Sequence, residues 1–332
     1  MTDIPRSPAL HGDAYRAALD SCEAMPPWLV EHLLAEDASF MLCSDGSIGK
    51  STISINAAAS MSAGTPVWGQ FLCPKPLRVY YLIGERDIRE PLRRLKRISE
   101  GDVLANPDNF WLSDSFSGTC NLLDDKHGDE LVKAVLRDCP EGPDVLFFDP
   151  LYSFVAGALS EDRTGNLLTR CFSRIKKELG CAMWITHHNV KFRIDDSGKQ
   201  VRANNPMYGS VWLFNHVTTQ YLIERETPSR VLLKRSKDNW GCQLPMIPLD
   251  YNPDNDVVTM DGEMGPRKKT ERVQTFLLER KARKMSFTKA ELVGATGVTD
   301  SQLSRILSEP PWRGKVKNSS PNGKPGLYTV VD

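Results

Sequence analysis

The octet SDGSIGKS, which runs from Ser44 to Ser51, constrains the fold of this chain more than any other segment. It follows a short apolar run that is typical of a strand, and a helix-like segment begins at Lys50. Glycines at Gly46 and Gly49 allow the backbone to curl, so that successive N–H groups and the start of the helix face one point. We therefore expect a strand, a tight loop and a helix that together bind a polyphosphate.

The octet matches the Walker A pattern GxxxxGK[ST] except at its first position, where Ser44 replaces glycine. In this pattern Lys50 reaches the β- and γ-phosphates, and the hydroxyl of Ser51 coordinates magnesium. The alternative is an ordinary glycine-rich turn between a strand and a helix. We predict an Mg-ATP site whose nucleotide-binding residues are Ser44, Asp45, Gly46, Ser47, Ile48, Gly49, Lys50, Ser51 and Thr52.

Apolar runs and helix-like segments alternate along the first two thirds of the chain. Expected strands cover residues 40–43, 78–83, 110–112, 145–148 and 182–186, and expected helices cover 50–63, 88–100, 129–138 and 167–179. Short strands that are apolar on both faces, separated by helices, are typical of a mostly parallel sheet covered by helices on both sides. The sequence therefore predicts an α/β fold.

Two acidic residues follow expected strands and are candidates for the chemistry at the phosphates. Asp149 ends the run VLFF and would hold the magnesium, because the carboxyl ends of parallel strands form the ligand-binding edge of such sheets. Pro150 occupies the position where many ATPases place a glutamate. Glu85, just after the strand VYYLI, is therefore our candidate for the general base, with a helix-capping acid as the alternative.

A third expected strand ends in WITHHN and brings Thr186, His187 and His188 to the same edge. A polar group here, His188 in our prediction, could hydrogen-bond the γ-phosphate and report its hydrolysis to the following loop. Metal binding by the histidine pair is disfavoured, because neighbouring side chains on an extended chain point to opposite sides. The cysteines form no CxxC pair and are expected to be buried thiols.

The rest of the chain divides into further regions. Residues 1–35 are expected to form an N-terminal arm that ends in a short helix at 27–35, and residues 36–250 the ATPase domain. Within that domain, strands at 211–213, 218–224, 230–233 and 243–249 are expected as hairpins appended to the sheet. Residues 251–270, with several prolines and glycines, are predicted to be a linker to a domain at 271–332.

The C-terminal region is basic although the whole chain is neutral. Residues 267–332 hold 14 Lys and Arg against 6 Asp and Glu, a net charge of +8, so the remainder carries −8. Three expected helices and a hairpin resemble a winged helix, which binds DNA or docks on a protein. The candidate DNA contacts are Ser301, Gln302 and Arg305 on the second helix of the helix-turn-helix, with Lys315 and Lys317 near the hairpin.

The order of these motifs resembles that of RecA-like ATPases grouped with plasmid RepA-type hexameric replicative helicases. The segments SDGSIGKS, VYYLIGERDIREPLRRL, VLFFDPL, WITHHN and SKDNWG carry the resemblance, which covers roughly residues 25–250. It implies a ring with ATP at subunit interfaces, where a basic residue of the neighbour completes the site. Lys234, Arg235 and Lys237 are the candidates, with a basic surface strand as the alternative, and Asn239 stands where related helicases place an arginine.

The same resemblance places DNA-contacting central loops at residues 190–210, where Lys191, Arg193 and Arg202 are the candidates. Such a stretch could equally be a surface insertion. The leading hypothesis is a Mg-dependent ATPase that acts on DNA in the replication of a plasmid, phage or mobile element. The alternatives are an ATP-gated DNA-binding regulator or loader without unwinding activity and, less favoured, a small-molecule kinase.

No run approaches the roughly 18 apolar residues that span a bilayer, and the N-terminus lacks the layout of a signal peptide. We therefore expect a cytoplasmic protein without membrane contact, which meets DNA, further copies of itself and a replication partner protein.

Overall fold

The fold is described here from a computed structural model. The description covers residues 9–22, 27–85, 87–159, 161–188, 193–194, 200–201, 211–239 and 244–260. Towards the C-terminus it covers 273, 277, 280–281, 286–296, 300–308, 312, 315–318 and 328–330. Among these residues, no helix combines the length and the apolar character needed to cross a bilayer.

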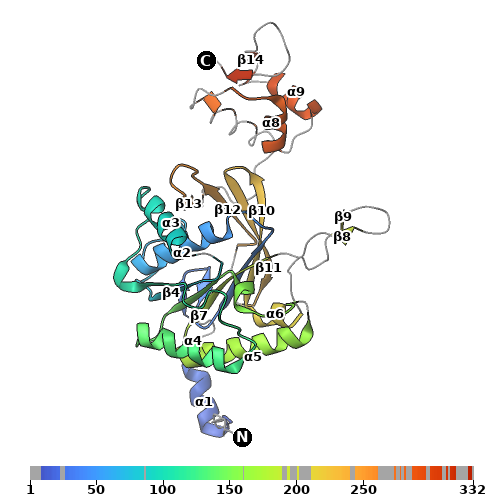
Figure 1. Ribbon diagram of the computed structural model, residues 1–332. Coiled ribbons are helices and arrows are strands. Elements are labelled where there is room, and N and C mark those ends of the chain that lie inside the picture. The colour runs from blue at the N-terminus through green and yellow to red at the C-terminus, as the bar shows by residue number, and fades with distance from the viewer. Residues whose placement is uncertain are drawn as a thin grey trace.

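A nine-stranded sheet forms the centre of the molecule (Figure 1). Its strands are β3 (Ser39–Ser44), β4 (Val79–Ile83), β5 (Phe110–Ser113), β6 (Val145–Asp149), β7 (Ala182–His188), β10 (Thr219–Thr227), β11 (Arg230–Asp238), β12 (Met246–Tyr251) and β13 (Val258–Thr259). They lie in the order β13-β12-β11-β10-β3-β7-β6-β4-β5. The pairs from β10 to β5 are parallel, and β11, β12 and β13 extend the sheet in antiparallel fashion.

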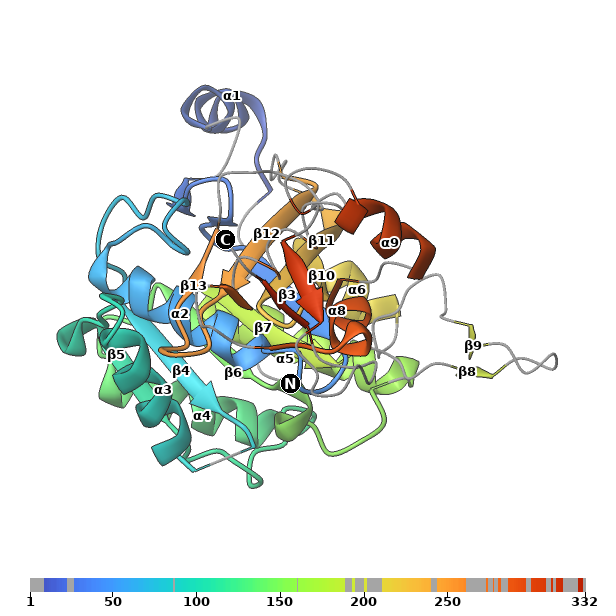
Figure 2. The same ribbon diagram turned by 90° about the horizontal axis from the view of Figure 1, so that it is seen from above.

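Helices cover both faces of this sheet (Figures 1 and 2). They are α2 (Lys50–Ala63), α3 (Arg89–Ser99), α4 (Asp125–Asp138), α5 (Asp162–Leu179) and α6 (Val211–His216). Alternate residues of one strand serve the two faces: Phe40 and Leu42 pack in the core that contains α2, whereas Met41 and Cys43 pack with α4 and α5. This period of two explains why the strands are apolar throughout. The predicted α/β, RecA-like architecture is confirmed.

The N-terminal region differs from the prediction in two ways. Residues 27–35 form no helix but a small antiparallel pair, β1 (Trp28–Val30) and β2 (Leu34–Ala35), which turns at His32 with φ of 59°. Its apolar residues belong to the main core, so periodicity alone could not separate a buried hairpin from a helix. Preceding it, α1 (Gly12–Ser21) is a helix without a buried residue, where we expected an irregular arm.

Two further predictions for the second half of the chain are wrong, and the predicted hairpin between them is confirmed. Residues 211–213 begin the helix α6 rather than a strand, with Leu213 buried and Trp212 46% exposed. β10 and β11 form an antiparallel hairpin as predicted, and the parallel pairing of β10 with β3 joins that hairpin to the main sheet. The predicted linker starts too early, because β13 joins the sheet and the backbone N–H of Met260 donates to the carbonyl oxygen of Trp68 over 2.8 Å.

The C-terminal region contains α8 (Lys289–Thr296), α9 (Asp300–Ser308) and an antiparallel pair of β14 (Val316–Asn318) and β15 (Tyr328–Val330). Seven buried side chains form a separate core there: Val273, Leu277, Phe287, Leu292, Leu303, Ile306 and Trp312. A capping box starts α8, since the backbone N–H of Thr288 donates to Glu291 and the N–H of Glu291 donates to the Thr288 hydroxyl. Most of the expected first helix lies outside the described residues.

Candidate functional site

The loop between β3 and α2 adopts the curled shape that the octet predicts. Gly49 has φ of 103°, in the left-handed region that favours glycine, and Ser47 has φ of 61°. The first hydrogen bond within α2 runs from the N–H of Ile53 to the carbonyl of Gly49, over 2.9 Å. The backbone N–H groups that open α2 therefore have no partner within the helix and are available to an anion.

The side chain of Lys50 is held by its own loop. Its Nζ donates to the carbonyl and hydroxyl oxygens of Ser44, over 3.3 and 2.9 Å, and to the carbonyl of Asp45 over 3.1 Å. Burial lowers the pKa of this ammonium, and the nearby charge of Asp149 opposes that shift. Ser44, where the Walker A pattern has glycine, thus adds a hydroxyl acceptor for the lysine.

Asp149 ends β6 and accepts three hydroxyl hydrogen bonds from neighbouring elements. Ser51 and Thr186 donate to Oδ1 over 3.1 and 2.6 Å, and Tyr81 donates to Oδ2 over 2.5 Å. Donors that stabilise the ionised carboxylate and fix its orientation suit a group that binds a cation directly or through water. Ser51 and Asp149 are thus placed together as the metal prediction requires.

Glu85 follows β4 at the same edge of the sheet. The preceding Gly84 donates its N–H to the carbonyl of Asp149 over 2.9 Å, and its own carbonyl accepts from Ser117 over 2.7 Å. A Cβ at position 84 would lie 2.6 Å from Cβ of Ser153, so this close approach requires glycine. The packing therefore fixes where the exposed Glu85 leaves the strand.

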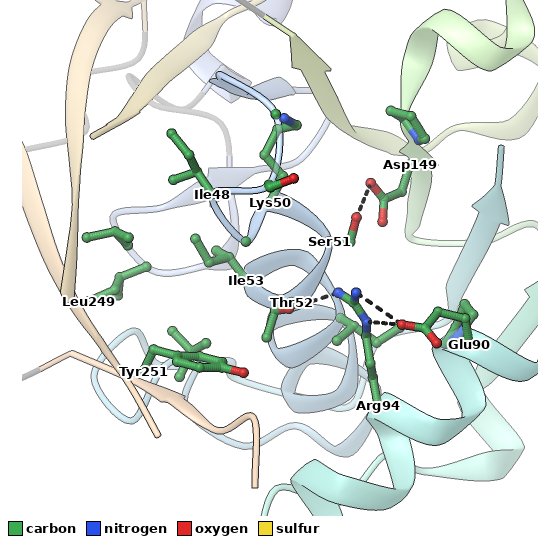
Figure 3. A pocket seen from close by; sticks show the side chains of 18 of the residues that line it. Ile48, Lys50, Ser51, Thr52, Ile53, Glu90, Arg94, Asp149, Leu249 and Tyr251 are labelled. Carbon is green, nitrogen blue, oxygen red and sulfur yellow. Dashed lines mark hydrogen bonds and ion pairs between the residues drawn. The ribbon is translucent and has the colours of Figure 1, made fainter. Parts of the chain in front are cut away.

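A cavity of about 630 Å³ joins these groups (Figure 3). Lys50, Ser51, Glu85 and Asp149 all line it, so the predicted phosphate-binding lysine and the two acidic candidates share one cavity. Away from Asp149 its wall includes the apolar side chains of Ile48, Ile53, Leu249 and Val258 and the ring of Tyr251, and Arg225 and Arg230 also line the cavity. A cavity of this size, with a charged and an apolar end, fits a nucleotide that carries Mg²⁺ on its phosphates and a planar base.

His188 also lines the cavity, while His187 is fully buried. Nδ1 of His188 lies 3.4 Å from Nζ of Lys50, and its ring centroid lies 5.0 Å from that of Tyr152. Burial lowers the pKa of His188, and the charge of Lys50 acts in the same direction. The imidazole is therefore neutral near pH 7 and accepts from Lys50, a position from which it could sense the phosphate chain.

Three basic residues of β11 do not line the cavity, unlike Arg230 at the start of that strand. We call these three, Lys234, Arg235 and Lys237, the β11 cations. Lys234 pairs with Glu224 at 2.6 Å and Arg235 with Asp238 at 3.0 Å. Lys237 donates to the carbonyls of Phe214 and Asn215 at the end of α6, over 2.8 and 2.9 Å. By register Arg235 lies level with Leu42 of β3 and Lys237 with Met41, in the interior of the strand.

The predicted DNA contacts are placed only in part. Lys191 and Arg202 lie outside the described residues, and Arg193 is described only as backbone of β8 (Arg193–Ile194), which pairs with β9 (Gln200–Val201). Ser301 and Gln302 are described as backbone of α9. The exposed side chains in this set are Arg305, Lys315 and Lys317.

Three residues at the cavity were missed by sequence reasoning. Tyr81 reads as an ordinary apolar strand residue, and Arg94 as one of several basic residues on an exposed helix. Arg225 donates from Nη2 to the carbonyl of Ser47 over 3.2 Å, across from the next strand. The pairing of β4 with β6 and of β10 with β3 and the packing of α3 beside α2 produce these contacts, and no local sequence motif predicts them.

Comparison with known proteins supports the geometry. A family model described as an AAA domain matches residues 10–193, which is more than half of the 332-residue chain. A search of the curated proteins found no match. The matched segment contains the phosphate-binding loop, Glu85, Asp149 and His188. The chain therefore belongs to the AAA domain family of P-loop ATPases.

Proposed function

We propose that this protein hydrolyses Mg-ATP and couples the hydrolysis to action on DNA, as a ring-forming replicative helicase or replication protein of a plasmid, phage or mobile element. The observation that carries the proposal is the shared cavity of Lys50, Asp149 and Glu85. A phosphate clamp, a metal-holding carboxylate and a second carboxylate for the attacking water are the groups that nucleotide hydrolysis requires.

Each residue has a distinct role in this proposal. The P-loop amides and Lys50 hold the phosphates, and Ser51 with Asp149 holds Mg²⁺, which neutralises charge on the phosphate oxygens. Glu85 accepts the proton of the attacking water. His188, which already contacts the Lys50 ammonium, detects the loss of the γ-phosphate and transmits it to the residues after β7.

Assembly and DNA binding complete the proposal. Arg235 or Lys237 of a neighbouring copy supplies the trans-acting cation, since neither lines the cavity of its own chain. Residues 190–210 and the basic C-terminal region, which carries a net charge of +8 from residue 267 onward, bind DNA. The separate core of that region and the exposed Arg305, Lys315 and Lys317 support a winged-helix-like module.

The test is the rate of ATP hydrolysis without DNA, with single-stranded DNA and with duplex DNA, beside the mass in solution with and without nucleotide. We expect Mg-dependent turnover, stimulation by single strands and a larger assembly with nucleotide. Lys50→Ala protein controls for a contaminating ATPase. Absence of turnover under all conditions contradicts the enzymatic proposal, and turnover that DNA never changes contradicts coupling to DNA.

The independent core of the C-terminal region favours one other candidate, an ATP-gated regulator or loader that binds duplex DNA without unwinding it. Deleting residues 267–332 should weaken duplex binding and leave the basal ATPase intact. If full-length protein binds one duplex sequence selectively and fails to unwind any, the regulator is the correct assignment. Unchanged duplex affinity after the deletion would remove this region from DNA binding altogether.

A further inference from the structure

Arg94 is a cation at the cavity that the roles above do not use. It lies on α3, its side chain is 23% exposed, and it lines the cavity together with Thr52 of α2. Its Nη1 donates to Oγ1 of Thr52 over 2.8 Å, while Nε and Nη2 each lie 3.3 Å from Oε1 of Glu90 (Figure 3). These hydrogen bonds use three of the five N–H groups of a guanidinium.

Arg94 contacts Thr52, the residue after Ser51, and lines the same cavity as Tyr81 and Tyr251. Burial raises the pKa of Tyr81, which donates to Asp149, and the charge of Arg94 opposes that shift. Burial also raises the pKa of Tyr251 at the apolar end, and Arg97 and Arg94 oppose it there. One guanidinium thus acts on the residues beside the metal-holding carboxylate and on those beside the apolar wall.

In a nucleotide, the α-phosphate and the ribose lie between the metal-bound phosphates and the base. The amides of a P-loop hold the α- and β-phosphates, and its lysine reaches the β- and γ-phosphates. The N–H of Ile53 already donates to the carbonyl of Gly49 within the helix. Thr52, the residue before it, is therefore the last one of the phosphate-binding segment. A cation fixed against Thr52 is therefore nearest the α-phosphate.

We propose that Arg94 is the cis-acting cation that binds the α-phosphate of the nucleotide. Glu90 and Thr52 hold the guanidinium at the wall of the cavity, where its planar fork suits two phosphate oxygens. Lys50 then binds the distal phosphates of the triphosphate, and Arg94 binds the proximal one. The inference rests on the proposed function only in requiring that the cavity binds a nucleotide.

The experiment measures the affinity of full-length protein for ATP, ADP, AMP and adenosine by calorimetry. Arg94→Gln should weaken the binding of ATP, ADP and AMP to the same extent, by about ten- to hundredfold, because each nucleotide loses one charge-assisted contact. Adenosine, which has no phosphate, should be unaffected. Lys50→Ala should weaken ATP and ADP far more than AMP. Arg89→Gln, on the exposed side of the same helix, is the matched control and should change none of the four.

A structural role for Arg94, as a bridge between α3 and α2, makes a different prediction. It would lower the melting temperature of the free protein and weaken adenosine as much as AMP, and either equal weakening or an unchanged AMP affinity overturns the inference. Arg94→Lys, which keeps the charge, should recover part of the AMP affinity that Arg94→Gln loses. If unsubstituted protein binds none of the nucleotides, the proposed function itself has failed, which is a distinct outcome.

Discussion

Lys50 at the cavity and the β11 cations Lys234 and Arg235 differ in what holds them. Lys50 contacts neutral acceptors, namely the oxygens of Ser44 and Asp45 and the ring of His188. Lys234 and Arg235 are each paired with a carboxylate of the same chain. A phosphate can replace neutral acceptors at little cost, whereas it must compete with an ionised partner for a paired cation.

This difference separates groups that one chain already brings together from residues that need a rearrangement before they can serve a neighbouring copy. The loop, Asp149 and Glu85 already share a cavity. The β11 cations lie two strands from β3, where Lys234 and Arg235 are paired with carboxylates and Lys237 is bonded to carbonyl oxygens, so assembly would have to redirect them. Four substitution experiments can break or sharpen the comparison.

The largest effect is expected from Glu85→Gln. An amide cannot accept the proton of water, so turnover should fall by about 10²- to 10⁴-fold while ATP affinity stays close to that of the unsubstituted protein. Phosphate release and equilibrium binding, measured on the same samples, check the two parts. Glu100→Gln, at the exposed end of α3, is the matched control. Normal hydrolysis by Glu85→Gln protein would remove this residue from the role of base.

Lys50→Ala should weaken the affinity for ATP by about a hundredfold, since charge-assisted hydrogen bonds to the distal phosphates are lost. Because Lys50 has no carboxylate among its hydrogen-bond partners in the described chain, removing it should not lower the melting temperature of the free protein. Titration with a fluorescent ATP analogue and thermal unfolding measure these quantities. A large loss of stability would show that Lys50 resembles the β11 cations after all.

The sequence predicts the cavity better than it predicts the surroundings of the β11 cations, for a physical reason. A Walker A loop and strand ends that carry Glu85 and Asp149 are local patterns, and parallel strands bring their carboxyl ends to one edge whatever their order. Their convergence could therefore be predicted from residue types and spacing, and the structure places them in one cavity.

The partners of distant residues could not be predicted in this way. Tyr81 reaches Asp149 because β4 pairs with β6, and Arg94 reaches Thr52 because α3 packs beside α2. The helix α6, whose end Lys237 holds, looks like a strand in isolation because a short apolar run fits either structure. Contacts between elements that lie far apart in the sequence determine all three features. A single sequence does not show which elements make those contacts.

The surroundings of Lys237 predict a pH effect on stability. Burial lowers the pKa of His216, at the end of α6, to about 4 from 6.5, and the charges of Lys176 and Lys237 act in the same direction. The unfolded chain then binds a proton near pH 6.5 that the folded protein does not. Stability should be full above pH 6.5 and fall as the pH drops to 4, by about 3 kcal/mol in total.

Urea unfolding between pH 7.5 and 4.5 measures this loss. His216→Asn protein, which cannot titrate there, should show a flatter profile than the unsubstituted protein. His188 has a pKa lowered in the same sense, so His188→Asn serves as the comparison at the cavity. If His216→Asn leaves the pH dependence unchanged, the lowered pKa of His216 is not the cause of the loss of stability.

The last experiment asks whether the β11 cations serve a neighbouring copy. Arg235→Gln protein keeps its own cavity but offers no guanidinium to a neighbour, whereas Lys50→Ala protein has a defective cavity but an intact Arg235. Each alone should lack DNA-stimulated turnover. In a head-to-tail ring mixed one to one, about a quarter of the interfaces combine the intact cavity with the intact arginine, so about a quarter of the activity should return. Recovery requires the pair with Asp238 to open on assembly, whereas a mixture no more active than its parts would mean that Arg235 only stabilises its own strand.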